Sequence, residues 1–104
     1  MLAVIFEVEM NPGREQDYFD LAGNLRPQLE AIDGFISVER FRSVSDEGKY
    51  VSLSFWRDEE AVTSWREHAE HRIAQAQGKK TIIADFRIRV AEVVRDYTLA
   101  DTGD

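Results

Sequence analysis

The order in which strand-like and helix-like patterns follow one another limits the fold of this chain more than any other feature. Four segments alternate apolar with other residues, as strands do, and two repeat apolar residues at helical spacing. The predicted strands are Leu2–Met10, Phe35–Arg42, Lys49–Trp56 and Ala84–Val94, and the predicted helices run from Arg14 to about Ala31 and from Asp58 to Gln77. The resulting order, βαββαβ, predicts an α+β, ferredoxin-like domain whose four-stranded antiparallel sheet carries both helices on one face.

The first helical segment contains a proline that does not fit its pattern. Pro27 has no N–H to donate to the carbonyl of Gly23, so a regular helix loses a hydrogen bond there. We expect a kink or a restart, with Pro27 in the first turn of a short second segment. Asp33 and Gly34 then end the segment.

The second helical segment combines clear boundaries with a mixed face. Asp58 is a suitable N-cap, and Gly78 is expected to end the helix. At about 100° per residue, Trp65 lies at the centre of a stripe to which Ala61, Val62, Ala69, Arg72 and Ile73 also belong. We expect His68 and Gln75 at the rim of this stripe and His71 further round. A stripe this polar is typical of the wall of a pocket.

The sheet is expected to be apolar on both faces. A sheet covered on one face only should be polar on the other, but the second rows hold Ile5, Tyr50, Trp56, Ala91 and Val93. Leaving them bare would expose a sizeable apolar patch. We therefore predict a homodimer in which two sheets meet face to face.

Length and charge exclude several classes of protein. At 104 residues the chain is expected to form one domain over residues 1–97, followed by a tail over residues 98–104 that is loose or docks on the partner subunit. A net charge of -7 disfavours nucleic-acid and anionic-membrane partners. The absence of cysteine excludes disulfides and thiolate sites. The apolar opening meets Glu7 and Glu9 too soon for a signal peptide, which favours a cytoplasmic protein.

Three stretches resemble the antibiotic biosynthesis monooxygenase family. They are AIDGFISVERFRS, YVSLSFWRDEEAVTSWREHAEHR and FRIRVAEVVRDY, and the similarity extends over about residues 1–97. The resemblance implies a dimeric α+β barrel with a pocket between the sheet and the helices of each subunit. It also implies a cofactor-independent monooxygenase that oxidises a small aromatic, phenolic or quinol substrate with O2.

Such chemistry requires a dry apolar slot, a base that titrates near neutral pH and donors that stabilise an anion. We expect His68 to be the base, Arg72 to hold the developing oxyanion and Trp65 to wall the aromatic ring. The predicted substrate-binding residues are Trp65, Gln75, Phe6, Leu25 and Phe55. A structural role explains each of them as well, since rim histidines and buried tryptophans are common.

Two alternatives remain open. In the haem-degrading branch of the family, the helix tryptophan is followed ten residues later by the haem-ligating histidine, and the first strand supplies an asparagine. Trp65 matches, but Gln75 stands at the histidine position and Leu2–Met10 holds no asparagine. If haem binds, His68 or His71 could still ligate the iron, and His71 is the candidate ligand. Otherwise no cofactor is expected, and no metal site is predicted. The second alternative is a non-catalytic dimeric module that binds a small ligand.

Overall fold

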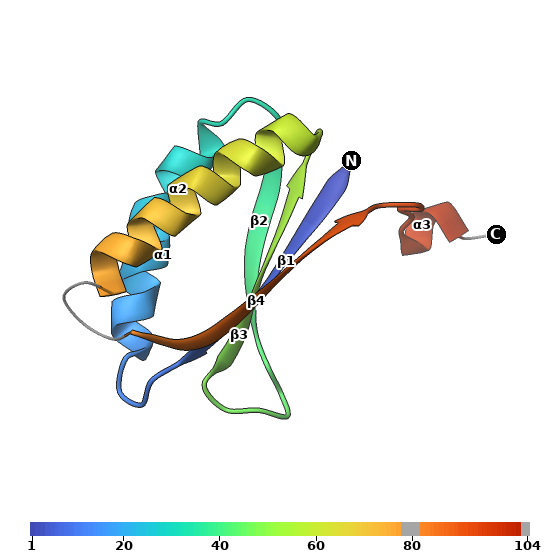
Figure 1. Cartoon of the computed structure of the whole chain (residues 1–104). Helices are drawn as coiled ribbons and strands as arrows, with labels where there is room; N and C mark the ends of the chain where they lie inside the picture. The colour runs from blue at the N-terminus through green and yellow to red at the C-terminus, as the bar shows by residue number, and fades with distance from the viewer. Residues whose placement is uncertain (78–81, 103–104) are drawn as a thin grey trace.

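The elements follow one another in the predicted order. The structure, a computed structural model, describes residues 1–77 and 82–102 (Figure 1). Its elements are β1 (Leu2–Met10), α1 (Glu15–Glu30), β2 (Phe35–Arg42), β3 (Lys49–Trp56), α2 (Glu59–Gln77), β4 (Ile83–Glu92) and the short α3 (Leu99–Thr102). The predicted βαββαβ order is therefore confirmed, and β4 ends two residues earlier than expected.

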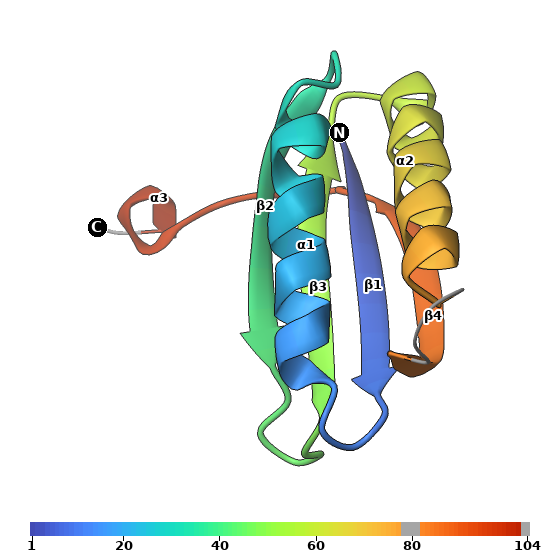
Figure 2. The same cartoon turned by 90° about the vertical axis from the view of Figure 1, so that its left-hand side faces the viewer.

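The sheet has the topology expected of two split βαβ halves. Its four antiparallel strands lie in the order β2-β3-β1-β4, so β1 and β3 are central. Both helices cover the same face, with α1 in front of β2 and β3 and α2 beside it toward β4 (Figure 2). This face and the two helices enclose the core, and the other face of the sheet is left open.

Pro27 does not interrupt the first helix. α1 runs as one helix through Pro27, so the expected restart is wrong. Pro27 lies close to the end of α1 on its exposed side, and Gly23, whose carbonyl loses the hydrogen bond, is exposed too. Water can satisfy that carbonyl, which reduces the cost of the proline.

The start of α2 is fixed by its cap and by a close approach to the turn that precedes β2. The Ala61 backbone N–H donates to Asp58 Oδ1 at 3.0 Å, which confirms the predicted N-cap. Gly34, at a φ of 98°, accepts a 2.8 Å hydrogen bond from the Arg57 N–H. The predicted end of this helix at Gly78 lies outside the described residues.

The third strand presents the opposite face from the one expected. Pairing with β1 sets Val4 opposite Ser54 and Val8 opposite Tyr50, so the even-numbered residues of β3 face the helices. Trp56 is fully buried there, and its indole N–H donates to Ser54 Oγ at 2.8 Å. The prediction that Tyr50 and Trp56 lie on the open face is therefore wrong. Both rows of β3 carry apolar residues, so the pairing register decides which row is buried.

The open face still carries an apolar area, with different members from β3. Pairing places Ile5, Leu53 and Phe55 on it, together with Val51, Phe41, Ile36, Ala91 and Val93. On the same face Arg89, directly opposite Ile5, pairs with Glu7 at 3.1 Å, and Glu7 stands opposite Val51. Apolar and charged residues are thus neighbours on the open face.

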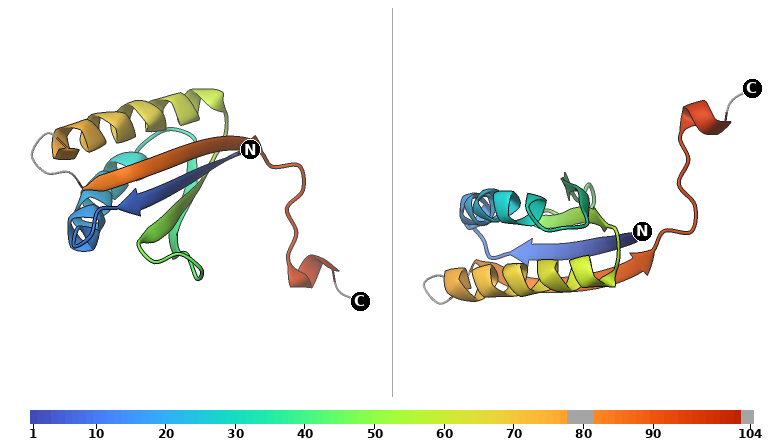
Figure 3. Two further views of the ribbon diagram at one scale, coloured as in Figure 1. Left: turned by 60° about the horizontal axis from the view of Figure 1, so that its bottom comes forward. Right: turned by 90° about the horizontal axis from the view of Figure 1, so that it is seen from above.

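The C-terminal segment leaves the domain after β4. It ends in α3, which stands clear of the body on the side away from α1 and α2 (Figures 1 and 3). Leu99 is 87% exposed and Tyr97 is 65% exposed. Within the described residues, no helix is long and apolar enough to cross a lipid bilayer.

Candidate functional site

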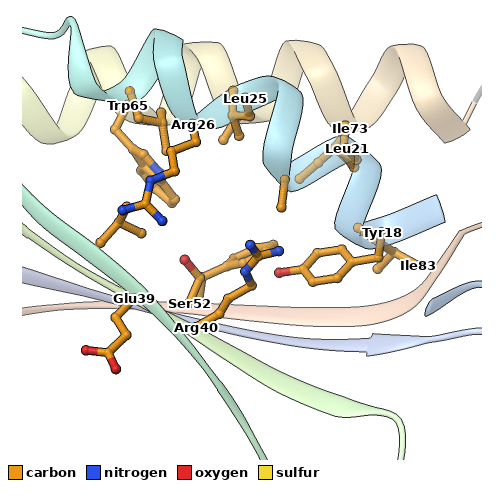
Figure 4. A pocket seen from close by; sticks show the side chains of 15 residues that line it. Tyr18, Leu21, Leu25, Arg26, Glu39, Arg40, Ser52, Trp65, Ile73 and Ile83 are labelled. Atoms are coloured by element: carbon orange, nitrogen blue, oxygen red, sulfur yellow. The ribbon is translucent and has the colours of Figure 1, made fainter. Parts of the chain in front are cut away.

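A cavity of about 70 Å³ lies between the sheet and the two helices (Figure 4). The larger part of its wall is apolar and comes from α1, α2, β1, β2 and the start of β4: Phe6, Leu21, Ala22, Leu25, Leu29, Val38, Trp65, Ala69, Ile73 and Ile83. The polar residues of its wall are Tyr18, Arg26, Glu39, Arg40 and Ser52. The site therefore has an apolar interior and a polar end.

The hollow exists because small side chains meet where large ones would fill the core. Ser52 stands opposite Phe6 on the helix-facing side of the sheet. Ala22 of α1 and Ala69 of α2 line the cavity together with it. Since protein interiors are otherwise packed to the density of organic crystals, these three positions leave the volume that the cavity occupies.

A second cavity, of about 180 Å³, opens between α2 and β4. The two cavities share four lining residues, Phe6, Trp65, Ala69 and Ile73. The rings of Phe6 and Trp65 meet edge to face, with centroids 6.4 Å apart. Their contact forms the wall that divides the space under α2.

The polar end of the first cavity is built around a buried tyrosine. Tyr18 is only 4% exposed, and burial raises the pKa of its hydroxyl, an effect that the nearby Arg40 charge opposes. The hydroxyl therefore keeps its proton at neutral pH and can donate a hydrogen bond. The Arg40 guanidinium carbon lies 5.9 Å from the centre of the Tyr18 ring and 5.7 Å from that of Phe19. These are cation–π distances.

The other charged residues of the wall lie away from the Tyr18 hydroxyl (Figure 4). Arg26 pairs with Glu30 along α1, with Nε 3.5 Å from Oε1. The Glu39 carboxylate points away from the cavity, toward the open side of the sheet (Figure 4). Arg40 is the cationic side chain that lies beside the Tyr18 hydroxyl in the same view.

Three of the predicted site residues line the cavity. Trp65 is 5% exposed and closes the interior from α2, Phe6 faces it from β1, and Leu25 faces it from α1. These positions agree with their predicted place beside the substrate. Their roles in binding remain predictions.

The two histidines and Gln75 lie outside both cavities. His68 is exposed, and its Nδ1 lies 2.9 Å from the Ser64 carbonyl oxygen, one turn back along α2. His71 and Gln75 are exposed as well. The expected position of His68 and Gln75 at the rim is wrong, because the fully buried stripe of α2 is narrow. It consists of Ala61, Val62, Trp65 and Ala69.

Arg72 and Phe55 are also placed differently from their predicted roles. Arg72 reaches α1, where its Nε donates to the side-chain oxygen of Gln28 at 3.1 Å when that amide is oriented to accept. This bond ties the two helices together and leaves Arg72 outside both cavity walls. Phe55 lies on the open face, because β3 has the opposite orientation to the one expected.

The polar residues of the cavity were missed from the sequence. Neither Tyr18 nor Arg40 was among the predicted site residues. One signal pointed to Arg40. It lies two residues after Val38 on β2 and therefore shares a face of the strand with that half-buried residue. Ser52 carried no signal, since a serine in a strand usually faces water.

Comparison with known proteins gives a consistent assignment. A family model described as antibiotic biosynthesis monooxygenase matches residues 1–77. A protein of Pyricularia oryzae named jasmonate monooxygenase ABM is 44% identical over 93 residues, which are 89% of this chain and 43% of that protein. The chain thus spans less than half the length of that relative. The Bacillus subtilis protein YqjZ is 34% identical over 93 residues, covering 89% of this chain and 79% of YqjZ.

Solved structures share the fold at lower identity. Rv0793 from Mycobacterium tuberculosis superimposes with a TM-score of 0.78 at 19% identity, covering 93% of this chain and 98% of that one. A structure described as an antibiotic biosynthesis monooxygenase gives a TM-score of 0.74 at 18% identity, covering 91% and 100%. With the family match over residues 1–77, these findings show that the chain belongs to the antibiotic biosynthesis monooxygenase family.

Proposed function

We propose that this protein is a monooxygenase that oxidises a small aromatic, phenolic or quinol substrate with O2 in the cavity between the sheet and the helices. The observation that carries the proposal is the apolar cavity closed by Trp65, with a protonated tyrosine at its polar end. Membership of the family and the name of the Pyricularia relative support the reaction class.

The proposed reaction requires the protein mainly to position the substrate and to exclude water from it. A substrate that loses a proton forms an anion, which passes one electron to O2, and the two radicals combine to a peroxide. Loss of water from the peroxide converts a CH2 carbon to C=O, so one oxygen atom enters the product and the other leaves as water. Phe6 and Trp65 provide aromatic walls for the ring. The neutral Tyr18 hydroxyl provides a hydrogen-bond donor at the polar end of the cavity.

The absence of a histidine from the cavity wall narrows the substrate class. Both histidines of the chain lie outside the two cavities, so neither is placed to remove the first proton there. The proposal therefore requires a substrate acidic enough to lose that proton to water without a histidine base. Phenols and quinols with activated ring positions meet this requirement better than unactivated hydrocarbons.

The residues around the cavities do not fit haem. A haem iron needs an axial side-chain ligand inside the pocket, and His71 is exposed on the outer side of α2. We therefore propose a reaction without a bound cofactor and derive no step through haem.

Oxygen uptake with a panel of anthrone-like, phenolic and quinol substrates tests the reaction. We expect uptake with the wild type and a large loss in Ala22→Phe, which fills the cavity from α1. Ala31→Phe at the exposed end of the same helix is the matched control, and urea unfolding checks that both variants fold. Uptake that survives Ala22→Phe in a folded protein contradicts the proposed site.

The variant His68→Ala tests whether His68 is the base, as predicted from the sequence, or takes no part in the reaction, as its position outside the cavities indicates. Because His68 faces solvent, we expect this variant to keep the wild-type rate of oxygen uptake. A loss of uptake in His68→Ala with an unchanged unfolding midpoint would restore the histidine to the mechanism.

A non-catalytic module that binds a small ligand is the second candidate function. The observation in its favour is that the described cavity wall contains no histidine to act as base. The two candidates differ in one measurement: a ligand that binds in the cavity and is recovered unchanged in the presence of oxygen favours the module.

We further propose a homodimer formed through the open face of the sheet. Ile36 is 49% exposed and Phe41 is 45% exposed there, and Leu53 lies near the centre of the sheet. A stable dimer buries about 800 Å² per partner, which an apolar sheet face of this kind can supply. The projecting tail, with Tyr97 and Leu99 exposed, is proposed to dock on the partner subunit.

Light scattering after size exclusion tests this assembly. We expect Leu53→Glu to shift the mass from dimer to monomer, because the glutamate would be buried without a partner. Thr63→Glu on the exposed side of α2 is the control and should leave the mass unchanged. A monomeric wild type refutes the homodimer. Removing residues 98–104 should weaken the dimer without changing the fold of the body.

A further inference from the structure

The cavity has a polar end whose side chains are free of partners within the protein. Among the described residues, neither the Tyr18 hydroxyl nor the Arg40 guanidinium has a hydrogen-bond or ion-pair partner. Tyr18 is more than nine-tenths buried, and Figure 4 shows its hydroxyl directed toward Arg40. Among the described residues no fully buried side-chain N or O atom lacks a hydrogen-bond partner, so the Tyr18 hydroxyl is accessible at the cavity surface. A ligand or a water molecule can satisfy it there.

The docking of α1 against β2 brings the Tyr18 hydroxyl and the Arg40 guanidinium together. Arg40 stands on the edge strand β2, directly opposite Ser52 of β3, and faces α1. α1 brings Tyr18 and Phe19 against the Arg40 side chain, so the two rings fix the guanidinium over the cavity mouth. The other arginine of the wall, Arg26, already has an acidic partner in Glu30. Arg40 is therefore the cation of the described wall that stands beside the Tyr18 hydroxyl without an acidic partner.

We infer that the ligand of this cavity is an amphipathic carboxylic acid, with its carboxylate held at the mouth by Arg40 and Tyr18 and its apolar body beside Leu25 and Trp65. This assignment rests on the proposed use of the cavity for a small substrate. An arginine and a phenol donate to carboxylate oxygens, and bonds to a charged acceptor are stronger than neutral ones. No acidic side chain of the wall competes, because Glu39 points away.

The location of Arg40 favours a permanent anion over one formed during the reaction. Arg40 is exposed, whereas Phe6 and Trp65 at the other end are at least nine-tenths buried. A carboxylate remains partly hydrated at an open mouth, which avoids most of the cost of desolvating a charge. A reacting carbon, in contrast, belongs in the dry interior. The polar end thus sets the orientation of the ligand, and Arg40 is a binding residue remote from the chemistry.

Binding of a matched pair of ligands tests the inference without turnover. The probes are phenylacetate and its neutral isostere phenylacetamide, followed by the next three longer ω-phenyl acids and their amides, measured by quenching of tryptophan fluorescence under nitrogen. For the wild type we expect the acid of the best pair to bind about tenfold more tightly than its amide. Because Arg40 is exposed, this preference should fall as the salt concentration rises.

Two arginine variants separate a specific contact from bulk charge. In Arg40→Gln the preference for the acid should fall to within about twofold, with the affinity for the amide unchanged. Arg42→Gln is the matched control, because Arg42 lies two residues along β2, over the ring of Tyr50 at 5.9 Å, and outside the cavity. It should keep the preference. Tyr18→Phe should reduce the affinity for the acid more than that for the amide.

Three outcomes overturn the inference: no probe binds, acid and amide bind equally to the wild type, or Arg42→Gln loses the preference as fully as Arg40→Gln. Failure of the proposed function looks different. Acids that bind through Arg40 but consume no oxygen leave the inference standing and remove the oxygenase. Oxygen uptake with neutral substrates that is indifferent to Arg40→Gln leaves the oxygenase and removes the inference.

Discussion

Replacing Gly34 by alanine tests how tightly the start of α2 is seated against the sheet. Gly34 has a φ of 98°, and a Cβ built on it would lie 2.8 Å from the Ala61 Cβ and 3.4 Å from the Arg57 Cβ. The left-handed backbone costs an alanine about 1–2 kcal/mol. The contact with Ala61 adds about 1–3 kcal/mol, because neither methyl group can swing away. We expect Gly34→Ala to destabilise the protein by about 2–5 kcal/mol.

Gly48→Ala is the matched control for backbone strain. Gly48 has a similar φ of 80°, but a Cβ there meets no atom within 4 Å. We therefore expect Gly48→Ala to cost only the backbone part, about 1–2 kcal/mol. Urea unfolding followed by tryptophan fluorescence measures both, because Trp56 and Trp65 are buried in the core. The Gly34→Ala midpoint should fall below that of Gly48→Ala by about 1 M.

A double-mutant cycle isolates the contact between the two methyl groups. Ala61→Gly removes the atom that the new Cβ would meet. The double variant should therefore lose about 1–3 kcal/mol less stability than the sum of the losses of the two single variants. The reasoning is refuted if Gly48→Ala costs as much as Gly34→Ala, or if positions 34 and 61 show no coupling.

Two further predictions concern stability. Ser54→Ala leaves the buried Trp56 N–H without its acceptor and should cost about 1–3 kcal/mol in urea unfolding; a cost below about 0.5 kcal/mol contradicts this account of the pair. The hydrogen bond from Arg57 lowers the pKa of Asp33, and the backbone N–H of Ala61, followed by Arg57, lowers the pKa of Asp58. A carboxyl whose pKa is lowered by folding contributes stability above its unfolded pKa of about 4 and loses it as the pH falls through the folded value. The stability advantage of the wild type over Arg57→Gln should therefore shrink on acidification, and an advantage that does not change with pH argues against these pairs.

The elements could be predicted from the sequence because each carries its own local signal. Alternation marked the strands, helical spacing marked α1 and α2, and the N-cap of α2 was visible in Asp58. The orientation of β3 was not predictable in this way. Its rows Tyr50–Ser52–Ser54–Trp56 and Val51–Leu53–Phe55 both hold large apolar residues, and only the pairing with β1 decides between them.

The candidate site was harder to predict because a cavity is made by missing volume. Ala22, Ser52 and Ala69 come from three different elements, and nothing in any one of them marks a hollow. Tyr18 and Arg40 likewise meet only through the docking of α1 on β2. Trp65 is buried and lines the cavity, because a tryptophan at the centre of an apolar stripe faces the core. The rim position of His68 failed, since the spacing of a helix gives direction but not how deeply the helix is embedded.

The edge-to-face contact of Phe6 and Trp65 has a consequence for ligand length. These rings act as a septum between two compartments under one helix, so neither compartment alone measures the room that the fold can offer. Replacing Phe6 or Trp65 with a smaller side chain would join the two compartments into one elongated cavity and leave its polar end unchanged. Relatives that carry other side chains at these two positions would then bind ligands of different length, while holding the same end of the ligand.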